Sequence, residues 1–380
     1  MKRLVAWLSI AATVLPVTAI APPKQTPDGF AVPQPGAVFA FPRDHGSHPE
    51  FRLEWWYITG HLLADDGQRF GFQATFFRQA GPRLEPSASA GRTSESFASD
   101  QLFLAHMALL DVKTGRFIYQ ERLARRGWDA DAAVHSLHVT NGPWSLSLLP
   151  AADGSIRLFG SIRSEAQLQL TLTPRKPLVV FGEKSVSRKA ADPTASSHYL
   201  TFPRLAAQGV VQRGAQVLRV TGQAWMDHEF SSSQLGADQV GWDWASIQLD
   251  DGREIMAYRM RRTDGSNDPY STLAWIDRDG AVSHVGPDCF TFTARSSWTS
   301  PLTRAIYPTR PTLRTRDPSS GEMREFRLEP LAEAQELTGA IGGVPYWEGA
   351  CRVLDEQGRE LGSAYLELTG YTGDLRATLQ

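Results

Sequence analysis

The residues best suited to chemistry lie in two short segments in which ionisable side chains adjoin aromatic ones. In the first, residues 44–57, Glu54 directly precedes Trp55, Trp56 and Tyr57. Side chains alternate along a strand, so Glu54 and Trp56 share one face and Trp55 and Tyr57 the other. A carboxyl group entering an aromatic strand is a candidate buried acid with a raised pKa. The alternative is a barrel-rim loop whose polar groups, including those of the nearby histidines, cap the backbone.

The second segment places Asp227, His228 and Glu229 consecutively between Trp225 and Phe230. An aspartate or histidine in such an apolar setting could donate or accept a proton in a mostly dry pocket. A structural network of polar groups is the alternative. A metal site is disfavoured, because neighbouring residues on a strand point to opposite faces and no HExxH pattern follows His228.

The remaining candidates are isolated histidines and aromatic residues in predicted strands. A lone histidine in a strand is more often a core residue than a functional one, and paired tryptophans equally suit a pocket or plain packing. These candidates are His106, His198, Tyr199, Trp242, Trp244 and Tyr258, of which Trp242 and Trp244 share a face.

These side chains must be positioned by short strands, because aromatic and β-branched runs alternate with turn signals along most of the chain. Asp-Gly and Thr-Gly pairs ending at Gly67, Gly115 and Gly154 each separate two apolar runs, which predicts three hairpins. We find no apolar stripe with helical spacing over a dozen residues. The pattern predicts an all-β protein, either barrel or sandwich.

An internal repeat divides the chain into two related halves. The order aromatic strand, Asp-Asp-Gly turn and return strand occurs at residues 55–78 and again at 241–261. The segments 108–115 and 274–280 correspond next, and the closing segments 222–227 and 362–367 correspond last. Three matches in one order favour two tandem β domains over chance similarity of hairpins. We place them at residues 41–235 and 236–380.

The N-terminal residues 1–21 predict a secretory signal peptide: two basic residues, an apolar stretch without charge and small residues at its end. An uncleaved membrane anchor is the alternative, and would be the only membrane contact. A Pro-rich arm follows at 22–40.

Two polar segments and two cysteines complete the sequence predictions. We expect disorder at 82–100 and an ordered connection at 182–197. Whether Cys289 and Cys351 pair stays open, since an exported protein permits disulfides but sequence gives no distance.

The composition excludes several classes of function. The chain has 380 residues, 42% of them hydrophobic, and a net charge of -2, so no basic footprint points to nucleic acid. It has 11 Trp, 18 Phe and 9 Tyr, which suits a ligand-lined cavity. There is no GxSxG elbow, GxGxxG loop or P-loop, and we expect no cofactor and no metal.

Four segments together resemble the superfamily of AttH-like proteins and hydroxyneurosporene synthase, a carotenoid hydratase; many of its bacterial members are labelled predicted secreted hydrolases. They are DHGSHPEFRLEWWYITGH (residues 44–61), HY before PR (198–204), GQAWMDHE (222–229), and YWEG with ELTGY (346–371). The resemblance implies two lipocalin-like antiparallel β-barrel domains in tandem. Its known relatives include alkene hydratases, pericyclase-type enzymes and transporter-associated proteins. No nucleophile supports a hydrolase.

Three functions follow as hypotheses. The first is an exported protein that binds an apolar small molecule or lipid in a barrel or interdomain cavity; the resemblance implies a possible ABC-type transporter as partner. The second is a hydratase or isomerase acting on an apolar alkene, with Asp227 as general acid. The third is an assembly factor without a ligand. The expected catalytic residues are Asp227, His228, Glu54 and Tyr199; the expected ligand-binding residues are Trp55, Trp56, Tyr57, His106, His198, Trp225, Trp242, Trp244 and Tyr258.

Overall fold

A computed structural model describes residues 21–81, 83, 101–127, 129–151, 153–341, 343–373 and 375. The signal peptide expected at 1–21, apart from its last residue, and the disorder expected at 82–100, apart from Arg83, lie outside the described residues. Among the described residues, no helix has the length and apolar character needed to cross a membrane.

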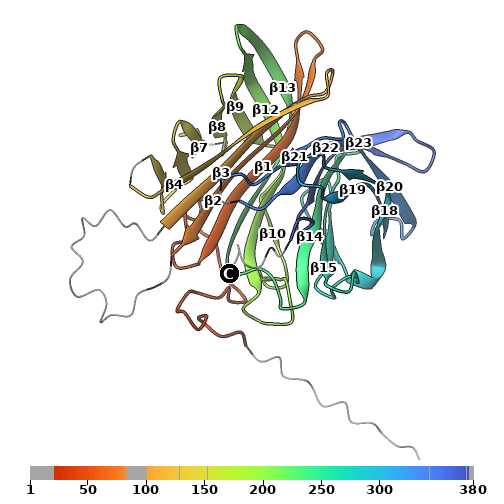
Figure 1. The fold of residues 1–380 in the computed structure, drawn as a ribbon. Coiled ribbons are helices and arrows are strands. Elements are labelled where there is room, and N and C mark those ends of the chain that lie inside the picture. Colours follow the sequence, from red (N-terminus) through yellow and green to blue (C-terminus); the bar gives the residue numbers. More distant parts are fainter. Residues whose placement is uncertain are drawn as a thin grey trace, which may run out of the picture.

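The described residues form two antiparallel sheets that lie side by side (Figure 1). The first has the order β4-β3-β2-β1-β13-β12-β9-β8-β7-β6-β5, with β10 and β11 pairing with β12. Its strands are β1 (Leu53–Ala64), β2 (Arg69–Ala80), β3 (Gln101–Asp111), β4 (Arg116–Arg125), β5 (Ala130–Ala132), β6 (His138–Asn141), β7 (Trp144–Leu148), β8 (Ile156–Ile162), β9 (Ala166–Pro174), β10 (Val179–Phe181), β11 (Ser187–Arg188), β12 (Ser196–Arg213) and β13 (Gln216–Ser233).

The second sheet repeats the plan with the order β17-β16-β15-β14-β23-β22-β20-β19-β18, and β21 pairs with β22. Its strands are β14 (Gln239–Leu249), β15 (Glu254–Arg262), β16 (Thr272–Ile276), β17 (Val282–Val285), β18 (Phe290–Thr299), β19 (Ile306–Arg316), β20 (Met323–Pro330), β21 (Glu336–Leu337), β22 (Tyr346–Leu354) and β23 (Glu360–Leu368). Two short 3₁₀ turns, η1 (Arg43–His45) and η2 (Pro287–Cys289), complete the described elements.

The three predicted hairpins are confirmed. Gly67, Gly115 and Gly154 have φ of 83°, 69° and 70° and connect β1 to β2, β3 to β4 and β7 to β8. Glycine suits these turns because a positive φ puts no Cβ in collision with the backbone. The repeat is also visible in the topology, since β1 pairs with β2 and β13 as β14 pairs with β15 and β23. The all-β fold with two tandem sheets is confirmed.

Each sheet curls around its own packed interior. Trp56, Phe72 and Leu158 belong to the first core, and Tyr307 and Trp347 to the second; all are fully buried. These large side chains fill the space in which a barrel ligand was one expectation. A third apolar cluster, which includes Tyr57, Tyr199 and Trp244, joins the two sheets. Because β1 is buried by the first core on one side and by the other sheet on the other, its sequence is apolar on both faces.

Polar bonds also tie the sheets together. The buried carboxylate of Glu254 on β15 pairs with Lys176 (2.6 Å) and Arg204 (2.5 Å) of the first half. Gln248 on β14 donates to the carbonyl of Ala224 on β13 (3.0 Å). The two sheets are therefore held in a defined relation, which any site between them requires.

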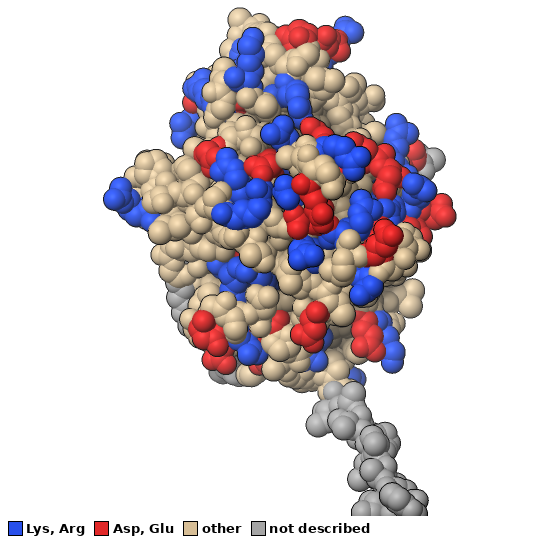
Figure 2. Space-filling view, turned by 90° about the vertical axis from the view of Figure 1, so that its right-hand side faces the viewer, with Lys and Arg blue, Asp and Glu red and all other residues tan. Residues whose placement is uncertain are grey.

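Two further expectations concern the arm and the cysteines. Residues 22–40 pass over the first sheet, and Phe39 packs edge-on against His198. Cys289 is exposed and Cys351 buried, and both are free thiols. The face in Figure 2 carries Lys/Arg and Asp/Glu side by side, without a patch of one sign, which matches the near-zero net charge.

Candidate functional site

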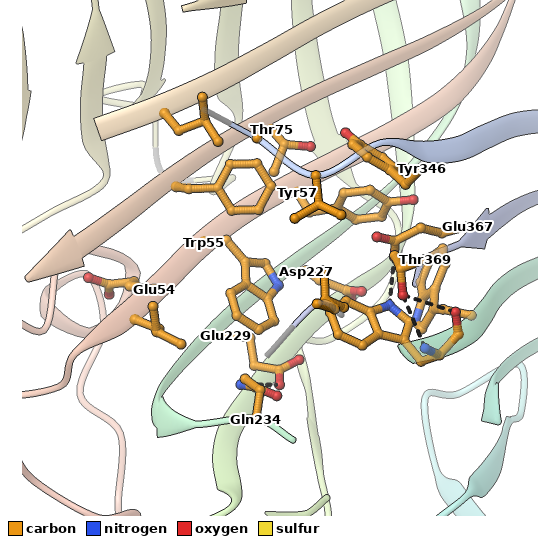
Figure 3. Close-up of a pocket in the computed structure, with 18 of the residues that line it drawn as sticks. Glu54, Trp55, Tyr57, Thr75, Asp227, Glu229, Gln234, Tyr346, Glu367 and Thr369 are labelled. Carbon is orange, nitrogen blue, oxygen red and sulfur yellow. Dashed lines mark hydrogen bonds between the residues drawn. The ribbon is translucent and has the colours of Figure 1, made fainter. Parts of the chain in front are cut away.

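A cavity of about 270 Å³ lies between the two sheets, lined mainly by apolar and aromatic side chains (Figure 3). The first sheet contributes residues from β1, β2, β3, β4, β12 and β13, and the second from β14, β15, β22 and β23. The exposed Leu102 and Leu123 give the cavity an apolar rim, whereas Asp227 and Tyr199 are buried. Of the two cavity positions considered from the sequence, the structure supports the interdomain one.

Strand register places the cavity residues of the first sheet in two parallel rows. Asp227, Tyr57, Thr75 and His106 are successive cross-strand partners on β13, β1, β2 and β3. The row beside it contains Glu229, Trp55, Phe77, Leu104 and Leu123 in the same manner. All of these residues line the cavity. The first row is mostly polar and the second mostly apolar, so a bound molecule would lie across the strands.

Asp227 is the focus of three hydrogen bonds. The indole of Trp225 (2.7 Å) and the hydroxyl of Thr201 (2.6 Å) donate to Oδ1, and the hydroxyl of Tyr199 donates to Oδ2 (2.7 Å). Burial raises the pKa of Asp227 to about 7, although these three bonds oppose the rise. The carboxyl group therefore exchanges its proton near neutral pH, within a mostly apolar cavity.

Tyr199 connects Asp227 to the second sheet. Its hydroxyl accepts a bond of 3.0 Å from the indole of Trp244 on β14. When Asp227 is ionised, the hydroxyl of Tyr199 donates its proton in the hydrogen bond to the carboxylate. When Asp227 is protonated on Oδ2, the bond between them can reverse, and the Tyr199 proton becomes available to a molecule in the cavity.

A buried ion pair stands beside Tyr199. Lys189, from the connection at 182–197, lies 3.1 Å from Glu229 and has its ammonium over the rings of Tyr199 (4.8 Å) and Tyr258 (4.4 Å). Burial alone would lower the pKa of Lys189, but Glu229 raises it above the usual value. The ordered connection expected from the sequence is confirmed, and it contributes a cation to the cavity.

The second sheet contributes a second titratable carboxyl group, Glu367 on β23. It accepts a bond of 3.3 Å from the indole of Trp242. Burial, aided by the charges of Asp227 and Glu229, raises the pKa of Glu367 to about 7. Its cross-strand partner Glu348 is fully buried, accepts the Tyr57 hydroxyl at 2.6 Å and also has a raised pKa, owing to burial and to Glu367.

Glu54 has a different environment from the one expected. Its carboxylate contacts Arg78 (2.9 Å), His48 (2.9 Å) and His228 (2.9 Å). Burial alone would raise the pKa of Glu54, but the charge of Arg78 and the histidine bonds lower it well below the usual value. The expectation of a raised pKa at Glu54 was wrong, because the sequence did not show which cation faces it. Figure 3 shows Glu54 apart from Asp227 and Glu367.

His228 belongs to the Glu54 cluster and not to the cavity. It lies on the face of β13 opposite to Asp227 and stacks on Trp56 at 4.8 Å. His48, Glu54 and His228 offer ligand atoms within 4.8 Å of one another, as a metal site would. Arg78 already supplies positive charge to this carboxylate. We therefore assign the cluster to stabilisation of the N-terminal segment against β1, β2 and β13.

The other expected ligand-binding residues divide into two groups. Those that line the cavity are Trp55, Tyr57, His106, Trp242, Trp244 and Tyr258, together with the expected catalytic residues Asp227, Tyr199 and Glu54. Three residues lie elsewhere. Trp56 is in the first core, His198 packs against Phe39 and bonds the backbone of residue 185, and Trp225 supports Asp227 from behind. These three residues do not line the cavity.

Sequence reasoning missed Lys189, Thr75, Tyr346 and Glu367. One signal was available for Glu367. The repeat matches 222–227 with 362–367, so Glu367 is the counterpart of Asp227. For Lys189 and Thr75 no comparable signal exists, since each enters the cavity through a long-range contact.

The fold and site define a class: a tandem two-sheet β protein with an acidic, aromatic-lined cavity between its halves. The model of the AttH-like family matches residues 32–371, and the chain belongs to this family. An AttH protein from Nitrosomonas europaea has 36% sequence identity and a TM-score of 0.79, over 90% of this chain and 100% of that one.

More distant structures share only the fold. A kievitone hydratase from Nectria haematococca has a TM-score of 0.65 at 13% identity, over 92% of this chain and 97% of that one. CghA in complex with Sch210972 has a TM-score of 0.55 at 14% identity, over 92% and 98%. No curated protein matches the chain.

Proposed function

We propose that this protein binds an apolar, unsaturated small molecule in the interdomain cavity and catalyses addition of water to it, or its isomerisation, by proton transfer. One observation carries the proposal. Asp227 is a buried carboxyl group that lines the cavity, is oriented by three donors and has a pKa of about 7. A general acid is most effective when its pKa lies near the working pH.

The two carboxyl groups suit complementary roles. Asp227, or Tyr199 backed by it, gives a proton to one alkene carbon. Water then bonds to the neighbouring carbon, and Glu367 accepts the proton that this water loses. The net change is addition of one water. In an isomerisation, Glu367 instead removes a proton from a carbon next to the cation.

The apolar lining supports the substrate class. Aromatic walls such as Trp55 and Trp242 offer large contact area without charge. The same fold occurs in a kievitone hydratase, which agrees with the proposed reaction class, although at 13% identity it carries only the fold. Export from the cytoplasm and an ABC-type transporter as partner remain proposals that rest on the N-terminal segment and on the resemblance alone.

The test extracts the apolar compound bound to Asp227→Asn in the native host and incubates it in heavy water with purified wild type, Asp227→Asn and Asp111→Asn. Asp111 is a buried aspartate paired with Arg213 (2.7 Å) and does not line the cavity, so it is a matched control. Mass spectrometry of the organic extract should show a deuterated product on wild type and control, and an unsaturated precursor on Asp227→Asn. The same unlabelled compound on all three proteins would contradict catalysis and favour a carrier.

A further inference from the structure

The polar row across the first sheet has a length that constrains its ligand. Asp227, Tyr57, Thr75 and His106 are consecutive partners on four adjacent strands, and all line the cavity. Strands lie about 4.8 Å apart, so the row extends for about 14 Å between its end residues. A molecule that reacts beside Asp227 and also reaches His106 must be elongated.

The far end of the row presents one unpaired hydrogen-bond donor. The hydroxyl of Tyr346 accepts a bond from Gln73 (3.2 Å) and forms a second one with Nδ1 of His106 (2.7 Å). In the tautomer in which Tyr346 donates to Nδ1, the imidazole proton is on Nε2. This nitrogen is buried and has no partner in the described part of the chain. Burial lowers the pKa of His106 to about 3, so the ring stays neutral.

A glycine lies beside this nitrogen. A Cβ built on Gly343 would lie 3.6 Å from Nε2 of His106, and Gly343 itself lines the cavity. A buried polar group without a partner destabilises a protein, and a ligand atom that satisfies it gains affinity. The Nε2–H of His106 is thus placed to bind an acceptor on a molecule in the cavity.

The charges around the cavity indicate that the ligand group beside His106 is a neutral hydrogen-bond acceptor. Its cations, Lys189 and Arg78, are already paired with Glu229 and Glu54. Glu121, the partner of His106 on β4, accepts bonds from the backbone of residues 339 and 341. Among the described residues, then, no charged side chain that lines the cavity stands at the His106 end. Neither a carboxylate nor an ammonium group would find a counter-charge there.

We infer that the ligand is an elongated, mostly apolar molecule with a neutral oxygen acceptor at one end, bound by Nε2–H of His106 while its double bond lies beside Asp227. This inference rests on the proposed function for the reacting end. His106 is a specificity-determining residue remote from the reacting atoms, and Trp55, Phe77 and Leu104 contact the apolar body.

The test measures binding of four probes of equal chain length that differ only in their end group: methyl decyl ketone, dodecane, dodecanoate and dodecylammonium. Methyl propyl ketone is a short control. A shift of the tryptophan emission maximum reports binding, because Trp55, Trp242 and Trp244 line the cavity. Wild type should bind methyl decyl ketone about fivefold more tightly than dodecane, the effect of one hydrogen bond, and more tightly than either charged probe. The short ketone should bind weakly.

The variants are His106→Phe, His106→Gln and His61→Phe. His106→Phe keeps ring volume but removes the donor, so the preference for ketone over dodecane should vanish while dodecane affinity is unchanged. His106→Gln retains an amide donor and should keep part of the preference. His61 makes one bond to the backbone of residue 364 (3.0 Å) outside this cavity, so His61→Phe should behave as wild type.

The outcomes separate the two proposals. If wild type binds none of the long probes, the apolar cavity function itself fails. If wild type binds them all without regard to end group, or if His106→Phe keeps the ketone preference, only the inference on His106 is overturned. Tighter binding of dodecanoate than of the ketone would also overturn it.

Discussion

The hydroxyl of Tyr199 on β12 lies 2.7 Å from Oδ2 of Asp227 on the neighbouring strand β13. The pair lies where the two sheets meet, since Trp244 of the second sheet bonds the same hydroxyl. The hydroxyl of Tyr199 therefore bonds both the carboxyl group of Asp227, whose pKa is near neutral, and a residue of the second sheet. Proton transfer in the cavity thus depends on how the two sheets pack against each other.

The rate of product formation should depend on pH as a bell with its maximum near pH 7. Glu367 must be ionised to act as base and Asp227 protonated to act as acid, and the pKa of each is about 7. Because the two groups interact, the two limbs belong to the pair. Glu367→Gln should lower the rate and lose the rising limb, and Asp227→Asn should abolish turnover. Deuterium incorporation measured across pH checks this; a rate that rises steadily through neutral pH contradicts it.

Tyr199→Phe should move the falling limb to higher pH and lower the maximal rate by about tenfold. The Tyr199 hydroxyl lowers the pKa of Asp227, so its removal lets that pKa rise further. A purely structural role for Tyr199 would reduce the rate without moving the limb. Trp244→Phe, which removes only the donor to Tyr199, is the milder companion and should give a smaller shift in the same direction.

Asp227 should make wild type lose stability as pH rises. Its pKa is about 7 in the folded protein, whereas the ordinary aspartate pKa of 3.8 applies to the unfolded chain. The proton on Asp227 therefore stabilises the folded protein. This contribution is complete below about pH 4 and is lost as pH rises through about 7. Between about pH 5 and about pH 8, the free energy of unfolding measured in urea should fall by roughly 2 kcal/mol less for Asp227→Asn than for wild type.

Asp111→Asn is the control for this experiment. The pKa of Asp111 is lowered, because hydrogen bonds and the charge of Arg213 outweigh burial. Its contribution is present above its unfolded pKa and is lost as pH falls, which is the opposite sign. Equal pH slopes for Asp227→Asn and wild type would argue against a raised pKa at Asp227.

Glu54→Gln should destabilise the protein by about 3–5 kcal/mol, since it leaves the buried guanidinium of Arg78 without its ionic partner. Urea unfolding of the variant checks this, with Glu50→Gln at a nearby exposed site as control. Because the pKa of Glu54 is lowered in the folded protein, the stability of wild type should also fall as pH drops below about 4.5, where the unfolded chain takes up the proton. A loss under 1 kcal/mol would contradict the assigned stabilising role.

The local features of this protein were available from its sequence. Gly67 and Gly115 marked turns, because an Asp-Gly or Thr-Gly pair between apolar runs has few other conformations open to it. The period of two separated Trp56 from Trp55 and Tyr57, and the structure confirms this, since Trp56 lies in the first core and the other two line the cavity. The repeated order of strands reflected the two sheets, and aromatic neighbours marked Asp227 as a buried carboxyl group.

Tertiary structure decided which side of each strand became a core and which became a cavity. The period of two groups side chains by face but does not name the face that meets the other sheet. Arg78 reverses the expected pKa shift of Glu54, and Lys189 enters the cavity from a distant connection; both depend on long-range register. His106 lies in the same cross-strand row as Asp227, at its other end, only because four strands align. No local sequence pattern encodes that alignment.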